Sequence, residues 1–205
     1  MANITIIGAG NMGAAIAAVA VAGGNTVQVL ARDASKAAAA NPSANAGAIG
    51  DPVTGDIVVL ALPYGAALEV IAELGSQLDG KILVDISNPV DFSTFDSLVV
   101  PADGSAAREI AKRVPSAVVL KAFNTNFAAT LHTGTVGDAT TTVIVAGDDA
   151  DAKAALIGAI AGSGISAIDG GSLGRARELE ALGFLQLTLA AGEKTSWTSG
   201  FALAK

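Results

Sequence analysis

The stretch IIGAGNMGAAIAA, residues 6–18, places three glycines at Gly8, Gly10 and Gly13. The apolar run at residues 4–7 predicts a buried strand, and the small residues at 11–22 predict a helix that can lie close to a sheet. On a strand, turn and helix of this kind, the first glycine permits the tight turn, the second lets the backbone approach a pyrophosphate, and the third allows close packing. Free N–H groups at the start of the helix favour phosphate there. The stretch therefore predicts a dinucleotide site, with a glycine-rich turn that binds nothing as the alternative.

Composition narrows the class of protein. The chain has 205 residues, 51% of them hydrophobic, which is enough for one compact unit. It contains no cysteine, so disulfides, thiolate metal sites and cysteine nucleophiles are excluded. A net charge of −7, without any run of Lys or Arg, argues against a nucleic-acid or anionic-membrane partner. No stretch is apolar and long enough to span a bilayer, and the chain begins without a basic leader, so we expect a soluble, cytoplasmic protein.

Apolar runs alternate with helical patterns along the chain. The predicted strands are residues 4–7, 26–30, 56–62, 81–86, 117–121, 142–146 and 165–169. The predicted helices are residues 11–22, 34–40, 65–74, 105–114, 149–161 and 173–191. This alternation predicts an α/β fold with a Rossmann-type, doubly wound parallel sheet. Residues 1–170 would form the dinucleotide-binding domain, and residues 171–205 a small helical segment that completes the cleft or makes a dimer contact.

Two segments interrupt the alternation. Residues 41–55 are polar and glycine-rich and are predicted to be a loop. Residues 90–104 carry Phe92, Phe95 and Pro101 in an irregular stretch. These aromatic side chains either close over a flat ligand as a lid or attach the loop to the core.

The second strand indicates which dinucleotide is bound. An NAD site of this kind usually has an acidic residue at the end of this strand, but here the sequence is VLARDASK, residues 29–36. Arg32, with Ser35 and Lys36 nearby, is suited to grip a 2′-phosphate, so the sequence predicts NADP(H). Asp33 is the alternative ribose ligand if the strand ends later; otherwise it caps the next helix.

Later strands add residues at the same edge of the sheet, because an open α/β sheet binds ligands at the carboxyl ends of its strands. Asn88 and Asn124 carry amides that could bond a nicotinamide carboxamide, although both residues also form turns. The predicted lining of this crevice comprises Leu62, Pro63, Tyr64, Asn88, Pro89, Ala122, Phe123 and Asn124.

The chain resembles the family of NADP oxidoreductases that depend on the deazaflavin coenzyme F420. The resemblance rests on GAGNMG, LARDASK, DISNPVDF, GSAAREIAKRVPSAVVLKAFNT, VIVAGDDADAK and DGGSLGRARELEALG, which together run through nearly the whole chain. It implies hydride transfer between NADPH and a flat tricyclic acceptor, and a homodimer. It also implies that Asn11 and Met12 join the three glycines in holding the pyrophosphate, and that Arg32, Ser35 and Lys36 hold the 2′-phosphate.

Two stretches, KAFNT and DGGSL, are also similar to the cytosolic oxidoreductase domain of the six-transmembrane ferric reductases, which pass electrons from NADPH through a flavin. The acceptor is therefore F420 or a flavin such as FMN or FAD. Members that use the deazaflavin often have a His-Thr pair where this chain has Asn124 and Thr125. The one histidine, His132, is predicted to lie on a loop at the surface and not to donate a proton.

Hydride transfer requires donor and acceptor to be held face to face, and the cofactor supplies the chemistry, so no catalytic side chain is predicted. The sequence has no cluster with metal-ligand spacing, no nucleophile elbow and no P-loop lysine. A reductase of imines or small carbonyls would normally need a larger helical partner domain or a positioned proton donor, whereas only residues 173–205 are left over here. The alternative from another class is an NADP(H) sensor, in which Tyr64, Phe92 or Phe123 would fill the space beside the nicotinamide. Trp197 and Phe201 are predicted to cover the site or to contact a second copy; Trp197 could instead fill the domain junction.

Overall fold

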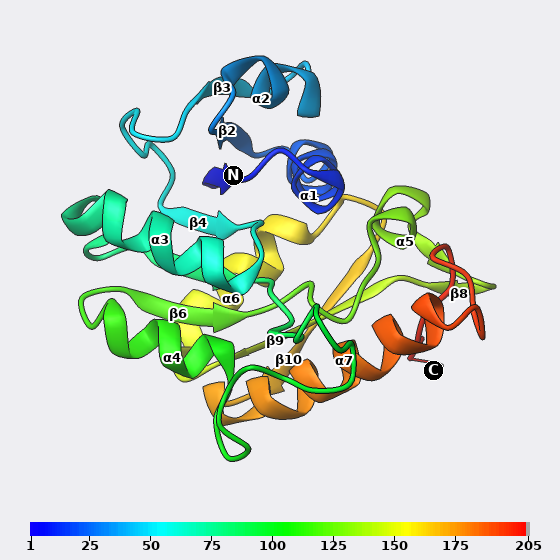
Figure 1. Ribbon diagram of the computed structural model, residues 1–205. Coiled ribbons are helices and arrows are strands. Elements are labelled where there is room, and N and C mark those ends of the chain that lie inside the picture. The colour runs from blue at the N-terminus through cyan, green and yellow to red at the C-terminus, as the bar shows by residue number, and fades with distance from the viewer. Residues whose placement is uncertain (204–205) are drawn as a thin grey trace.

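A computed structural model describes residues 1–203 and contains one large sheet with helices on both faces (Figure 1). The spatial order of the strands is β10-β9-β6-β5-β4-β1-β2-β3. The strands of this sheet are β1 (Asn3–Ile7), β2 (Thr26–Ala31), β3 (Asn45–Ala48), β4 (Ile57–Leu60), β5 (Ile82–Asp85), β6 (Val118–Lys121), β9 (Thr142–Gly147) and β10 (Ser166–Gly171). A separate small hairpin is formed by β7 (Thr135–Val136) and β8 (Ala139–Thr140).

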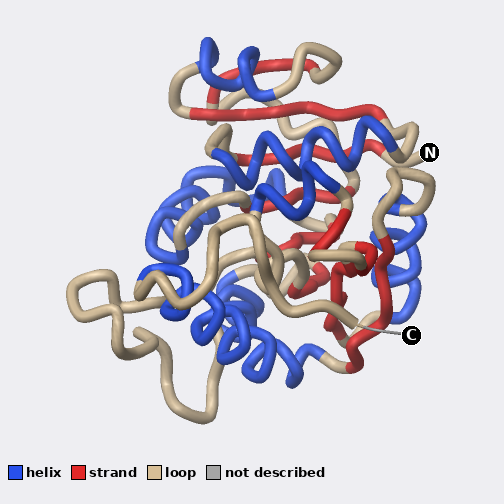
Figure 2. Tube along the Cα trace, turned by 90° about the vertical axis from the view of Figure 1, so that its right-hand side faces the viewer, coloured by secondary structure: helices blue, strands red, loops and turns tan. Residues whose placement is uncertain are grey.

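The helices cover the two faces of the sheet, as the tube in Figure 2 shows from the side. The α-helices are α1 (Asn11–Ala22), α2 (Ala34–Ala40), α3 (Tyr64–Leu74), α4 (Ala106–Arg113), α5 (Ala128–Thr133), α6 (Ala150–Ile160) and α7 (Ala176–Ala191). Short 3-10 turns, η1 (Gly75–Leu78) and η2 (Leu173–Arg175), follow α3 and precede α7. No helix among the described residues is long and apolar enough to cross a membrane.

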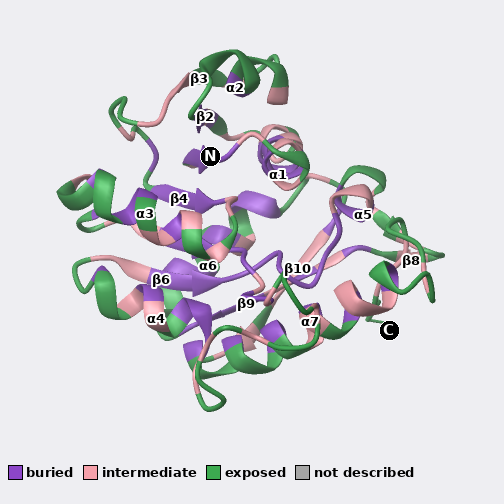
Figure 3. Ribbon diagram, viewed as in Figure 1, coloured by how far each residue is buried: buried purple, intermediate pink, exposed green. Residues whose placement is uncertain are grey.

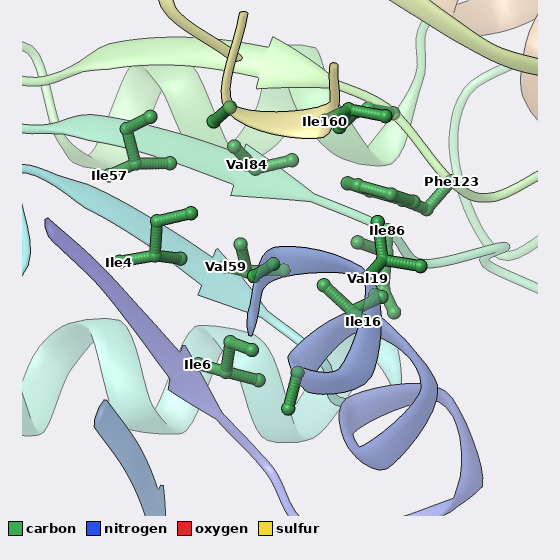
Figure 4. Packing of buried hydrophobic residues seen from close by; sticks show 14 of the residues in the cluster. Ile4, Ile6, Ile16, Val19, Ile57, Val59, Val84, Ile86, Phe123 and Ile160 are labelled. Carbon is green, nitrogen blue, oxygen red and sulfur yellow. The ribbon is translucent and has the colours of Figure 1, made fainter. Parts of the chain in front are cut away.

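The central strands are hydrophobic on both faces, which is typical of a parallel sheet covered by helices on each side. In β4, Ile57 and Val59 face the cluster under α1 and α6, whereas Val58 and Leu60 face the cluster under α3 and α4. Figure 3 shows these central strands buried, and Figure 4 shows how residues from neighbouring strands meet α1. The predicted α/β class with a Rossmann-type sheet is confirmed.

Three details of the sequence-based prediction are wrong. The sheet is not entirely parallel, because β9 runs antiparallel to β6, pairing Leu120 with Gly147, and β10 follows β9 in parallel. The predicted loop at residues 41–55 contains β3, an edge strand of small, largely exposed residues that lacks an apolar pattern. The predicted connection after residue 121 contains α5, which places His132 on a helix and not on a loop, though His132 is exposed as expected.

Candidate functional site

The glycine turn between β1 and α1 has the geometry that nucleotide binding requires. Gly8 has φ +115°, a conformation that side chains rarely adopt, and a Cβ there would overlap the carbonyl oxygen of Ala61. A Cβ at Gly13 would overlap the carbonyl oxygen of Gly8, so helix and turn touch at this point. A Cβ at Gly10 would meet nothing within 4 Å. Folding therefore requires Gly8 and Gly13, while Gly10 leaves open space beside the backbone.

The N-terminus of α1 borders that open space. Its N-cap is Gly10, and no side chain caps the helix. The first intrahelical bond runs from the N–H of Ala14 to the carbonyl of Gly10, at 2.9 Å. The N–H groups of Asn11, Met12 and Gly13 consequently lack intrahelical acceptors and can bind phosphate oxygens.

The end of the second strand carries a cation. Strand β2 ends at Ala31, so Arg32 follows it directly and is largely exposed, with its Nη2 3.2 Å from Oε2 of Glu69 on α3. Asp33 is the N-cap of α2: its carboxylate accepts bonds from the N–H and the hydroxyl of Ser35, at 2.9 and 2.6 Å. These bonds lower the pKa of Asp33. Asp33 is thus committed to capping; Ser35 and Lys36 are exposed in the first turn of α2.

A pocket of about 380 Å³ opens beside the start of α1, and none of the described residues that line it is charged. Its lining comprises Asn11, Met12, Ile86, Asn88, Phe123, Asn124, Asn126, Phe127, Ala128, Ala129, Leu187 and Trp197. Residues predicted from the sequence therefore meet here from the α1 turn and from the segments after β5 and β6. The C-terminal part contributes Leu187 from α7 and Trp197 beyond it.

The remaining predicted residues lie outside the lining of this pocket. Leu62 lies behind the glycine turn, within contact distance of a Cβ built at Gly8, and Pro63 is the exposed N-cap of α3. Tyr64 is half-buried at the start of α3, and this burial raises the pKa of its hydroxyl. Pro89 and Ala122 are buried next to lining residues.

Asn88 and Asn124 bond to each other. The Nδ2 group of Asn88 donates to the backbone carbonyl of Asn124, and that of Asn124 donates to Oδ1 of Asn88, both at 2.8 Å. Asn124 also donates to the carbonyl of Leu179 on α7, at 2.8 Å. A Cβ at Gly183 would collide with the amide of Asn88, so this glycine lets α7 lie directly against the pair. The two amides fasten the C-terminal helix to the strand ends.

Phe123 sits at the turn after β6 with φ +62°, a backbone conformation that is uncommon for any residue other than glycine. Its ring is 1% exposed and packs against Ile16 and Ile160 in the core under α1 (Figure 4). This turn ends the strand abruptly. The turn lets Asn124 and Asn126 line the pocket. The ring of Phe123 lies between these residues and the sheet, where it fills the core.

A buried ion cluster is formed by residues close in sequence to the pocket lining, and no local pattern in the sequence indicates it. The Nζ of Lys121 is 2.8 Å from Oδ2 of Asp85 and 2.8 Å from Oε1 of Glu180, and all three side chains are at most 1% exposed. Glu180 also accepts bonds from the N–H groups of Ala106 and Ala107, where α4 begins. Burial raises the pKa of Glu180, a shift that the neighbouring ammonium partly offsets. The cluster joins β5, β6, α4 and α7, and its Asp85 directly precedes the pocket-lining Ile86.

Sequence reasoning also missed the part of the wall formed by Asn126, Phe127 and Leu187. The ring of Trp197 lies 5.1 Å from that of Phe127, centre to centre. A signal was present for two of these residues, because FNTNF repeats the pattern of amide and aromatic that had marked Phe123 and Asn124. No group of His, Asp or Glu side chains in residues 1–203 is arranged to hold a metal ion.

The loop at residues 90–104 lies outside the pocket wall. Phe92 is 65% exposed and makes an edge contact with Phe95, with ring centres 5.7 Å apart. Val90 is buried and pairs with Leu98 in an isolated bridge, so this end of the loop is attached to the core. None of Tyr64, Phe92 and Phe95 lines the pocket.

Comparison with known proteins identifies relatives that are named as reductases. Residues 3–89 match the family described as NADP oxidoreductase, coenzyme F420-dependent. The F420-dependent NADP reductase of Methanocaldococcus jannaschii is 34% identical over 132 residues, which are 62% of this chain and 59% of that protein. Metalloreductase STEAP3 of Rattus norvegicus is 31% identical over 181 residues, which are 88% of this chain and 36% of that protein. The chain thus spans less than two thirds of the length of either relative.

A crystal structure described as that of a candidate F420-dependent NADP-reductase from Arthrobacter sp. FB24 superposes with a TM-score of 0.85, at 28% identity and with 100% of both chains covered. The matches show that the chain resembles dinucleotide-dependent oxidoreductases of the Rossmann class. More particularly, the resemblance to the F420-dependent NADP oxidoreductases is confirmed.

Proposed function

We propose that the protein is an NADP-dependent oxidoreductase that transfers hydride between NADP(H) and a flavin-like acceptor, with coenzyme F420 as that acceptor. The observation that carries the proposal is the pocket itself, which opens beside the uncapped start of α1 and has an uncharged wall of amide and aromatic side chains. Such a wall suits two flat rings stacked face to face. When bound, NADPH supplies the hydride from its nicotinamide ring.

The residues of the chain have separate tasks in holding the cofactor. The open space beside Gly10 and the N–H groups of Asn11 and Met12 would receive the pyrophosphate. Arg32 would pair with the 2′-phosphate, exchanging its contact with Glu69 for a more highly charged partner, and Ser35 and Lys36 lie within the same turn. Leu62, Pro63 and Tyr64 stay proposed contacts of the ribose or the nicotinamide, although none of them lines the pocket.

The C-terminal segment would complete the cleft, since Leu187 and Trp197 already form part of the pocket wall. Exposed apolar side chains continue along this part of the molecule at Leu185, Phe201 and Leu203. We propose that a second copy of the chain covers them, giving a homodimer.

A second candidate function has its own support. The similarity to a metalloreductase extends over more of this chain than the similarity to the methanogen reductase does. In addition, Asn124 and Thr125 stand where many deazaflavin enzymes have His-Thr. An NADPH-dependent flavin or ferric reductase is therefore the alternative. A non-enzymatic NADP(H) sensor is less favoured. It would need an aromatic side chain to block the site, but Tyr64 and Phe92 do not line the pocket, and the ring of Phe123 packs into the core.

The test is oxidation of NADPH by the purified protein, followed by absorbance. Coenzyme F420, FMN, FAD and a ferric chelate with FMN are offered in parallel, and NADH replaces NADPH in a control series. Turnover with F420 and NADPH, and slow turnover with NADH, would support the proposal. Turnover with FMN or the chelate and none with F420 would favour the second candidate, and binding of NADPH without turnover of any acceptor would favour the sensor.

A further inference from the structure

Two side-chain oxygens of pocket-lining residues have no hydrogen-bond partner among residues 1–203. The side chains of Asn124 and Asn126 are 5% and 7% exposed, and the Oδ1 atom of each is buried and accepts no hydrogen bond. Both residues line the pocket. Nearly all buried polar groups in folded proteins are hydrogen-bonded, so a pair of unmet acceptors in one pocket wall requires a physical reason.

The orientation of both amides is determined by what they donate to. The Nδ2 group of Asn124 donates to Oδ1 of Asn88 and to the carbonyl of Leu179, at 2.8 Å each. The Nδ2 group of Asn126 donates to the carbonyl of Thr142, at 3.1 Å. These partners are carbonyl oxygens, which only accept, so exchanging N and O in either amide would lose its bonds and bring like atoms together. The unpaired atoms are therefore oxygens, and they need donors.

The rest of the wall offers no competing recognition group. Within residues 1–203 no charged side chain lines the pocket, and the amide of Asn88 is already paired with Asn124. The remaining side chains are mostly apolar, including Met12, Ile86 and Phe127. A ligand edge that carries N–H groups would satisfy the two oxygens, whereas a carboxylate or a ketone oxygen would face them unfavourably.

We propose that Asn124 and Asn126 form a subsite for an uncharged N–H edge of a planar heterocycle, and that Asn126 is a residue that determines specificity. The inference rests on the proposed function, which supplies two sources of such an edge. One is the primary carboxamide of nicotinamide, and the other is the imide N–H of a flavin-like ring. Asn88 is a positioning residue, because its amide holds Asn124 and has no unmet atom.

The first experiment compares ligands on the wild-type chain and needs no variant. Trp197 is the only tryptophan and lines the pocket, so its fluorescence reports binding. The carboxamide arm compares NADP⁺ with its 3-acetylpyridine analogue, in which a methyl replaces the NH₂ group, and with its nicotinic acid analogue, which carries a carboxylate. The imide arm compares FMN with N3-methyl-FMN.

If removing the N–H donor weakens binding about 10-fold or more in either arm, the subsite is supported. The arm that shows the loss identifies which ligand group, carboxamide or imide, supplies the N–H edge. In the nicotinamide case the carboxylate analogue should bind still more weakly. Equal affinities within both arms overturn the inference while leaving NADP⁺ binding, and hence the proposed function, intact. Absence of binding by NADP⁺ and by FMN overturns both.

Variants assign the effect to residues. In Asn126→Ala, the ligand with the N–H donor should bind no more than about 3-fold more tightly than the ligand without it, because the acceptor is gone. The matched control is Ser163→Ala, which removes another buried, unpartnered oxygen, but one that lies outside the pocket wall; its ratio should equal that of the wild type. An unchanged ratio in Asn126→Ala would remove Asn126 from the subsite. Should this variant fail to fold, the wild-type comparison decides the proposal alone.

Discussion

Replacing Lys121 with Met should destabilise the protein far more than replacing an exposed lysine does. The Nζ of Lys121 lies 2.8 Å from carboxylates of both Asp85 and Glu180, in a fully buried site. Methionine has a similar shape but no charge, so the change leaves two carboxylates facing each other without a cation. Removing one partner of a buried ion pair typically costs about 3–5 kcal/mol of unfolding free energy. For a chain of this size that loss lowers the melting temperature by about 6–20 °C.

The assay is urea unfolding followed by circular dichroism at neutral pH, with the slope m compared between variants to verify that the same surface unfolds. The matched control is Lys112→Met. Its Nζ makes an even shorter ion pair with Glu109, at 2.6 Å, but the lysine side chain is 71% exposed. Exposed pairs contribute about 0–1 kcal/mol, so burial and not distance decides the difference.

Removing a carboxylate as well should partly restore stability. In the double variant Lys121→Met/Glu180→Gln, one of the two uncompensated carboxylates is gone, so the loss should be smaller than in Lys121→Met alone. A loss below about 1 kcal/mol in Lys121→Met, or one equal to that of Lys112→Met, would refute the claim that the cluster holds its charges in a buried, mutually dependent arrangement.

Three further predictions concern the nucleotide turn, the 2′-phosphate and pH. Gly10→Ala should change the unfolding free energy by less than about 1 kcal/mol, since the added Cβ meets nothing within 4 Å, yet it should weaken NADPH binding at least about 10-fold. Gly13→Ala should lower the unfolding free energy by about 1–3 kcal/mol, because the added Cβ overlaps the Gly8 carbonyl. Calorimetry and urea unfolding of the two variants test this, and a large stability loss in Gly10→Ala would contradict it. Arg32→Glu should weaken NADPH about 10- to 100-fold more than NADH in titrations, whereas equal losses would mean that Arg32 does not contact the 2′-phosphate. Because the pKa of Glu180 is raised in the native state, the native protein retains a proton that the unfolded chain releases above the ordinary pKa of 4.5. The stability of the wild type relative to Glu180→Gln should therefore fall as pH rises from 4.5 towards the raised pKa. A pH series of urea midpoints that shows the opposite slope would contradict the assignment.

The sequence predicted best the features that depend on neighbouring residues. The bounds of α1 and α2 agree with the prediction to the residue, because a glycine turn starts the first helix and the Asp33 cap starts the second. Parallel strands bring their carboxyl ends to one edge of the sheet, so five predicted site residues line one pocket. These residues are Asn11, Met12, Asn88, Phe123 and Asn124. The roles assigned to individual site residues stay predictions.

The features missed depend on contacts between distant segments. Strand β3 has no apolar alternation because it is an edge strand with little burial. The antiparallel β9 overlaps β6 only at its last residues, so no pattern within either strand reveals its direction. Lys121 meets Glu180 only because α7 packs back against the strand ends, and the unmet oxygen of Asn126 depends on which neighbours its amide finds after folding.

The most direct test of the proposed function follows the hydride itself. NADPH that carries deuterium on one or the other face of its reactive nicotinamide carbon is mixed with the protein and oxidised coenzyme F420, and the reduced F420 is analysed by mass spectrometry. We predict that deuterium appears in F420 from one of the two labelled forms only, because a pocket with fixed walls presents a single face of the ring. Deuterium in F420 from neither form, under conditions where NADPH is bound, would contradict hydride transfer to this acceptor.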